Sequence, residues 1–195
     1  MTRRKGSRDR LLGSALELFC RQGYDGVSTR AIAKKAGVNE VTLFRLFGSK
    51  EKVLLAVLDR EADIRSRIPS MAFEPGSDVA ADLARFGKSM LEGMLAKAPL
   101  MKLGMTEMHR RPGMWKHISP APTAAIEMLG RYFDRAGEKG LIRKVNSRLA
   151  ATVFFSFFFR SMVMTTFLGR DMRFKLDEKA ISGFCSLFLE GLRKR

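Results

Sequence analysis

Side chains suited to contacting DNA recur along one short stretch near the N-terminus, AIAKKAGVNEVTLFRLFGSKE (residues 31–51). Thr42 can hydrogen-bond to a phosphate or a base edge, and its methyl group can contact the methyl of thymine. Arg45 can reach a phosphate or a guanine edge, and Lys50 can reach a phosphate. These residue types at this spacing predict contacts with double-stranded DNA.

Neighbouring residues have compatible chemistry. Ser28 and Thr29 begin a helix whose free N–H groups suit a phosphate, with Arg30 beside them. Glu40 repels phosphate, but its carboxylate can accept from cytosine N4 or lie clear of the DNA backbone. Each residue alone would be an ordinary surface group, so the prediction rests on the combination. The predicted DNA-contacting residues are Ser28, Thr29, Arg30, Asn39, Glu40, Val41, Thr42, Phe44, Arg45 and Lys50.

Two short helices are predicted to position these side chains. Ser28 is a candidate N-cap for a helix over 29–36, and Asn39 for a helix over 40–46. Gly37 lies between them, where a tight turn requires a left-handed residue. The predicted inner positions are Ile32, Ala33, Ala36, Val38, Leu43 and Phe47. Packing through small alanines would hold the second helix rigidly away from the body, as in a helix-turn-helix.

The rest of the chain also has helical periodicity, which predicts an all-α protein of about nine helices. Pro69, Pro75 and Gly76 interrupt the pattern and predict a loop over 67–78. We expect a DNA-binding domain at 1–60, with the helix-turn-helix at 28–47, and a second helical domain at 61–195. The other predicted helices are 8–21, one beginning after Ser49, 78–97, 100–110, 121–139, 147–168 and 177–193.

The charge of the chain favours anionic partners. Its 195 residues include 36 Lys and Arg against 20 Asp and Glu, a net charge of +16. The first 60 residues hold 13 of the basic and 6 of the acidic residues, so they are the more basic part. The densest run, TRRKGSRDR (2–10), is either a soluble tail or an arm that contacts phosphates. A basic helical protein that coats DNA without sequence preference is an alternative at this point.

Several other classes of protein are disfavoured. Cys20 and Cys185 lack metal-type spacing, and free thiols favour the cytoplasm. His109 and His117 fit no standard metal site, and no nucleotide-binding or hydrolase motif is present, so we expect no enzyme, cofactor or metal. The apolar segment 149–169 is long enough to span a membrane, but it carries Arg160 near its middle. We therefore expect a buried or interface helix and no membrane association.

The segment STRAIAKKAGVNEVTLFRLFGSKEKVLLAVL (28–58) resembles the DNA-binding segment of the TetR (tetracycline-repressor-like) family of bacterial regulators. ALELFCRQGYDGVS (15–28) matches that family's first helix and its junction, and GLIRKVNSRLAATVF (140–154) resembles the lead into its eighth helix. The family commonly has Tyr in place of Phe44 and His in place of Leu46. The first difference removes a hydrogen bond to phosphate.

The resemblance implies an all-α homodimer that binds a palindromic operator as a transcriptional regulator, here expected to be a repressor, with an activator as the alternative. The last two helices of each subunit would form a four-helix bundle across the two-fold axis. That would cover an apolar stripe that is otherwise exposed. The implied interface residues are Phe154, Phe155, Ile181, Phe184 and Phe188.

The resemblance also implies a cavity for a small, largely apolar effector, although a regulator without an effector remains an alternative. Glu107 and Arg160 would be costly to bury unpaired, so they either pair with each other or face a charged effector. The apolar candidates could equally fill an ordinary core. The candidate lining is Met90, Met94, Met101, Met105, Glu107, Met108, Trp115, Phe158 and Met162.

Overall fold

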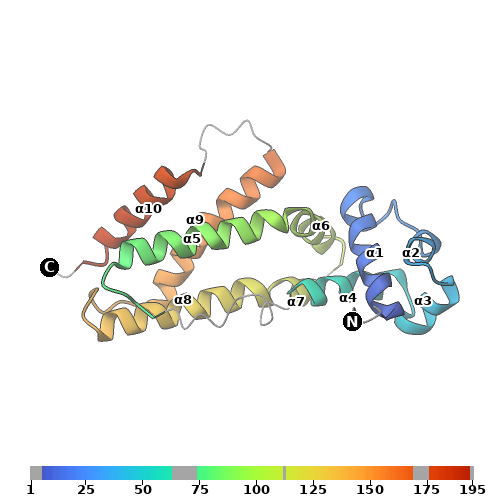
Figure 1. Cartoon of the computed structure of the whole chain (residues 1–195), viewed down its shortest axis with the longest axis horizontal. Helices are drawn as coiled ribbons and strands as arrows, with labels where there is room; N and C mark the ends of the chain where they lie inside the picture. Colours follow the sequence, from blue (N-terminus) through green and yellow to red (C-terminus); the bar gives the residue numbers. More distant parts are fainter. Residues whose placement is uncertain (1–5, 63–73, 112, 169–175, 194–195) are drawn as a thin grey trace, which may run out of the picture. The chain divides into compact units, whose positions relative to one another are not determined.

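The computed structural model describes residues 6–62, 74–111, 113–168 and 176–193. Over these ranges it contains ten helices and no strand, so the all-α prediction is confirmed (Figure 1). Residues 2–5 of the basic N-terminal run and 67–73 of the expected loop lie outside the described residues. The helices are α1 Ser7–Gln22, α2 Thr29–Ala36, α3 Glu40–Phe47, α4 Lys50–Ala62, α5 Val79–Ala96, α6 Ala98–Met108, α7 Trp115–Ile118, α8 Pro120–Glu138, α9 Ser147–Leu168 and α10 Glu178–Glu190.

Local signals in the sequence set the ends of α2 and α3. The Ser28 side chain accepts a hydrogen bond from Ala31 N, and the Asn39 side chain accepts one from Val41 N, so both predicted N-caps are confirmed. Gly37 ends α2 at φ 64° and ψ 40°, the left-handed conformation expected of it. These caps stop one short helix and start the next within three residues, which makes the turn of the helix-turn-helix.

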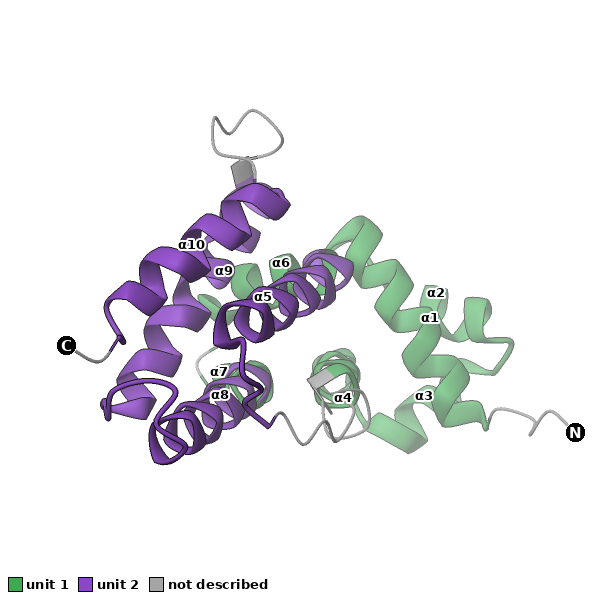
Figure 2. Ribbon diagram, turned by 60° about the vertical axis from the view of Figure 1, so that its left-hand side comes forward, with its two compact units in different colours: residues 1–64, 99–120 green, residues 65–98, 121–195 purple. Residues whose placement is uncertain are grey.

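The chain divides into two compact units, which Figure 2 colours separately. Unit 1 comprises Met1–Ile64 and Pro99–Pro120, and unit 2 comprises Arg65–Ala98 and Ala121–Arg195. Unit 1 therefore takes in almost all of α6 and the whole of α7, in addition to the N-terminal helices. The core of unit 1 includes Leu103 and Met114 together with residues of α1 to α4.

Helix α7 also contacts α4 within unit 1. His117 Nδ1 lies 2.5 Å from Asp59 Oδ1, and Gly104 of α6 lies against Ile118 and Leu58. The sequence predicted neither α7 nor this packing.

Unit 2 is built around α5, which packs against both α9 and α10. Six phenylalanine rings join these helices through tilted, edge-on and stacked contacts. The closest pair is Phe157 of α9 and Phe184 of α10, whose parallel ring centroids lie 3.7 Å apart. The six rings are Phe86, Phe154, Phe157, Phe158, Phe184 and Phe188.

This packing corrects part of the expected dimer interface. Phe154, Phe155 and Ile181 are buried within the protomer, with 0%, 7% and 5% of their surface exposed. Phe184 and Phe188 are half-buried and belong to the same ring cluster. The large apolar side chains that α9 and α10 do expose include Leu149, Val153 and Leu187, with 61%, 50% and 71% of their surface exposed.

Within the described ranges, α9 is the one helix long and apolar enough to span a bilayer, over Ser147–Phe167. The core helix of a soluble protein has the same length and composition. Phe154 and Phe158 of α9 lie in the core of unit 2 with no exposed surface, and Arg160 on the same helix is exposed. Only 33% of this apolar segment is buried within the protomer, so the expected buried or interface helix stays a prediction.

Candidate nucleic-acid interface

The helix-turn-helix holds α3 with one face buried and one face exposed. Leu43 is fully buried and Phe47 is 8% exposed, so they anchor α3 to the core of unit 1. Val41 and Phe44, on the other side, are 71% and 46% exposed. All the predicted inner positions are buried except Val38, which is half-buried against the same core. With Leu46, three large apolar side chains are exposed on this helix of eight residues, which indicates a surface that contacts a partner.

The predicted polar contacts of α3 lie on or beside this face. Arg45 is exposed, and Thr42 is half-buried. Leu46, which we did not predict as a contact, is 41% exposed. The spacing gave no clear signal for this exposure, because Leu46 lies three residues after the buried Leu43 and next to the buried Phe47.

Thr29 and Glu40 are the first residues of α2 and α3, and they contact each other. Thr29 Oγ1 donates a hydrogen bond to Glu40 Oε1 at 2.5 Å. The sequence predicted both residues as separate contacts to DNA and gave no indication of this bond. It connects the N-terminal ends of the two helices.

Lys50 lies at the start of α4, but its ammonium group points toward the α1–α2 connection. Its Nζ donates to the backbone oxygens of Tyr24 and Val27, both at 3.0 Å, and lies 4.1 Å from the centroid of the Tyr24 ring. An ammonium group has three donors, so these two bonds leave one for a phosphate. Lys50 therefore holds the helix-turn-helix in place in addition to any contact with DNA.

Glu107 is paired, which corrects the expectation for its charge. Its carboxylate, 4% exposed, binds the guanidinium of Arg111 within unit 1, and Arg160 is exposed on α9. The Arg111 guanidinium also lies 4.0 Å from the centroid of the Tyr24 ring. Burial raises the pKa of the Tyr24 hydroxyl despite this nearby positive charge. Glu107 thus stabilises a contact between α6 and the end of α1.

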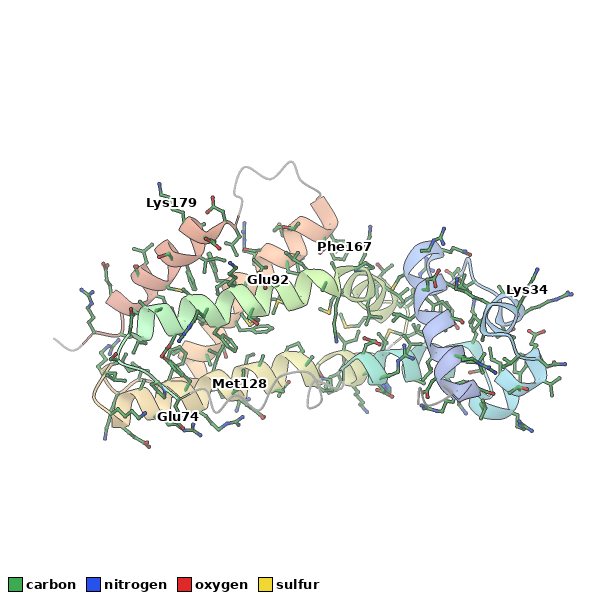
Figure 3. The ribbon with its side chains drawn as sticks, viewed as in Figure 1. Lys34, Glu74, Glu92, Met128, Phe167 and Lys179 are labelled. Carbon is green, nitrogen blue, oxygen red and sulfur yellow. The ribbon has the colours of Figure 1, made fainter. Side chains whose placement is uncertain are left out.

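Basic side chains surround the helix-turn-helix. Arg30 and Lys34 of α2 are exposed, and Figure 3 shows the Lys34 side chain extending away from the helix. Lys35 instead binds Glu17 of α1 at 2.8 Å, and this hydrogen bond lowers the pKa of the Glu17 carboxyl. A positive surface of this kind raises the rate and affinity of binding to DNA at low salt.

The expected effector-lining residues are divided between the two units. Met90 and Met94 of α5 are half-buried in unit 2, and Phe158 and Met162 of α9 are fully buried there. The other five belong to unit 1, where Met101 and Met105 are half-buried. Met108 and Trp115 are 41% and 55% exposed, so neither lies in the core of its unit.

An open groove of about 360 Å³ lies in unit 2, and none of the expected lining residues borders it. Its walls come from the segment before α9, the start of α9, and the end of α10 with the residues just after it, and they include Leu149, Val153, Phe188 and Leu192. Among the described residues, no three His, Cys, Asp or Glu side chains gather as metal ligands.

The fold and this surface define a DNA-binding regulator with a helix-turn-helix, and comparisons with known proteins agree. Residues 11–57 match the model of bacterial regulatory proteins of the tetR family. Residues 81–189 match that of the AefR-like transcriptional repressor C-terminal domain. The chain is 28% identical to the HTH-type transcriptional regulator YvkB of Bacillus subtilis, over 94% of this chain and 95% of that protein.

Two solved structures have the same fold. A TetR-family transcriptional regulator of Mesorhizobium loti superposes with a TM-score of 0.82 at 21% identity, over 96% of this chain and 97% of that one. FadR of Bacillus subtilis, solved in complex with stearoyl-CoA, superposes with a TM-score of 0.71 at 17% identity, over 95% of this chain and 99% of that one. The chain belongs to the TetR family of transcriptional regulators, and the resemblance noted in its sequence is confirmed. Its relatives are transcriptional regulators.

Proposed function

We propose that this chain is a cytoplasmic, homodimeric repressor that binds a palindromic operator and is released from it by a small, largely apolar effector. The observation that carries the proposal is the exposed face of α3, with Val41, Phe44 and Arg45 projecting from a helix anchored by Leu43 and Phe47. An anchored helix with an exposed apolar and basic face fits the major groove.

The match to a repressor C-terminal domain supports repression over activation. We assign DNA binding to residues 1–60 and effector binding and dimerisation to 61–195.

The dimer is supported by the surfaces of α9 and α10. Leu149 and Val153 expose at least half of their surface, and Leu187 exposes 71%. Two of these residues also border the open groove, so a second copy could fill it. A dimer would place two copies of α3 one helical turn apart on DNA, about 34–36 Å. We therefore assign the interface to this exposed surface, with Phe184 and Phe188 at its edge.

The effector is supported by the apolar packing between α5 and α9. Met90 and Met94 lie three and seven residues after Gly87, which contacts Phe158 of α9, so they lie on or near the face that meets α9. Flexible methionines beside a buried ring can rearrange around an apolar guest. The fold neighbour FadR was solved with stearoyl-CoA, so this compound and stearate are suitable first probes.

The test of DNA binding uses duplexes recovered by the wild-type protein from a random pool. Thr42→Ala and Arg45→Ala should each weaken binding to the recovered duplex by about 5- to 150-fold, as expected for one lost base or phosphate contact. Arg131→Ala is the matched control, because it removes the same charge from an exposed position of α8. Unchanged gel-shift affinity in both α3 variants would contradict the assignment of α3 as the reading helix.

The same duplexes test the alternatives. A protein that coats DNA without sequence preference would recover no common sequence. At each salt concentration it would bind a random duplex as tightly as any recovered duplex. A regulator without an effector would keep its affinity for the duplex when stearoyl-CoA or stearate is added. Release by either probe supports the effector part of the proposal.

A further inference from the structure

The hydrogen bond between Thr29 and Glu40 changes what each side chain can offer to DNA. A hydroxyl has one donor proton, and Thr29 uses it on Glu40 Oε1 at 2.5 Å. Thr29 therefore cannot donate to a phosphate while this bond is intact. The Glu40 carboxylate can accept further hydrogen bonds on both of its oxygens, but as a carboxylate it can only accept, so each partner must be a donor.

The two partners are also held in place. Each is half-buried at the first position of its helix. The caps beside them, Ser28 and Asn39, accept bonds from N–H groups of their own helices. The Glu40 carboxylate consequently has a fixed position at the N-terminal end of α3. A side chain that is already ordered loses less conformational entropy when it binds.

Few groups on DNA can donate to such a carboxylate. Phosphate oxygens repel it, and guanine N7 and O6 and thymine O4 are acceptors. The donors in the major groove are the amino groups of cytosine and adenine. Adenine also presents its N7 acceptor beside its amino group, whereas cytosine presents no acceptor there. A fixed carboxylate consequently discriminates in favour of cytosine.

We propose that Glu40, positioned by Thr29, is a specificity-determining residue that selects a cytosine in each operator half-site. This inference rests on the proposed function, because it requires α3 to lie in the major groove. Val41 and Phe44 extend the same exposed surface and would contact thymine methyl groups beside that cytosine. The net charge of +16 supplies attraction to phosphates that outweighs the repulsion from one carboxylate.

The test selects bound duplexes from a random-sequence pool with four proteins: wild type, Glu40→Gln, Thr29→Val and Thr29→Ser. Wild type should recover a palindrome with a fixed cytosine at one position of each half-site. Glu40→Gln should change that base to adenine, because an amide bonds adenine N6 and N7 together. All other positions of the half-site should stay the same.

The Thr29 variants test the positioning role. Thr29→Val keeps the shape of the side chain but removes the hydroxyl, so the preference for cytosine should weaken while the rest of the palindrome persists. Thr29→Ser keeps the hydroxyl and should retain the preference. Fluorescence anisotropy should measure the affinity of each protein for the recovered duplex and for the same duplex with thymine in place of the cytosine. Wild type should bind the two duplexes with affinities that differ by about 5- to 150-fold, and Thr29→Val with a smaller difference.

The outcomes separate this inference from the function on which it rests. If Glu40→Gln recovers the same cytosine as wild type, Glu40 does not read that base and the inference is wrong, although the protein still recognises an operator. If Thr29→Val discriminates as well as wild type, Thr29 has no positioning role. If wild type recovers no palindrome, the proposed function fails together with the inference. Because Glu40→Gln and Thr29→Ser are conservative changes, the test does not depend on whether Thr29→Val folds.

Discussion

The contact between α5 and α9 depends on the absence of a side chain at Gly87. A Cβ atom at this position would lie 2.8 and 2.9 Å from the Cε1 and Cε2 atoms of Phe158, and closer still to Cζ. Favourable contacts between carbon atoms lie at about 3.5–4.0 Å. Phe158 has no exposed surface, and the rings of Phe154 and Phe184 lie within 5.7 Å of it, centroid to centroid. The ring therefore has little room to move.

Gly87→Ala should destabilise unit 2 by about 1–2 kcal/mol. Overpacking of a core costs about 1–3 kcal/mol, and we take the upper part of this range because the ring is closely packed. Replacing glycine by alanine inside a helix stabilises the helix by about 1 kcal/mol, which offsets part of this cost. For a chain of this length, about 1 kcal/mol corresponds to a change in Tm of about 2–4 °C, so Gly87→Ala should lower the Tm by about 2–8 °C.

Gly93 of the same helix is the matched control. No atom lies within 4 Å of a Cβ built there, so Gly93→Ala should raise the stability by about 0.5–1 kcal/mol. Circular dichroism melts of wild type and both variants should be compared at one protein concentration, because the Tm of a dimer depends on concentration. If Gly87→Ala melts no lower than Gly93→Ala, the packing of α5 on α9 described here is incorrect.

Three further changes test other parts of the structure. Leu187→Glu should convert the dimer to a folded monomer, because Leu187 is 71% exposed in the protomer, and a dimer that persists in light scattering would place the interface elsewhere. Burial raises the pKa of both thiols, to about 11 for Cys185, which is 1% exposed, so at pH 8 a thiol reagent should modify the half-buried Cys20 first, and equal rates for the two thiols would contradict this burial. Glu107→Gln should lower the free energy of unfolding in urea by about 1–2 kcal/mol, because it weakens a charged bond to the partly exposed Arg111. An unchanged midpoint would mean that this ion pair adds no stability.

Features that depend on short stretches of sequence were predictable. The caps at Ser28 and Asn39, the left-handed Gly37 and the inner faces of α2 and α3 follow from residue type and helical spacing. The bounds of α9, Ser147–Leu168, match the helix predicted over 147–168, most of which is one apolar run. Helix α7 was missed because four residues are too few to show a period.

Features that depend on contacts distant in sequence were not predictable in the same way. Thr29 and Glu40 are eleven residues apart, and only the packing of α2 on α3 brings them together. Helix α9 is apolar around most of its circumference, so its sequence could not show that Phe154 and Phe155 face their own protomer. Arg111 lies four residues after Glu107, and this helical spacing was a signal that could have identified the ion pair.

The contacts of Arg111 limit how α6 can move relative to the DNA-reading helices of unit 1. Its guanidinium binds the buried Glu107 of α6 and lies 4.0 Å from the ring centroid of Tyr24, just beyond the end of α1. Lys50 bonds to the backbone oxygen of the same tyrosine and lies over its ring. Any displacement of the end of α6 must therefore break the contact between Arg111 and Tyr24 or carry Tyr24 and Lys50 with it. Leu103 adds buried apolar surface to the core that α6 shares with α1 to α4, so separating α6 from these helices would expose that surface to water.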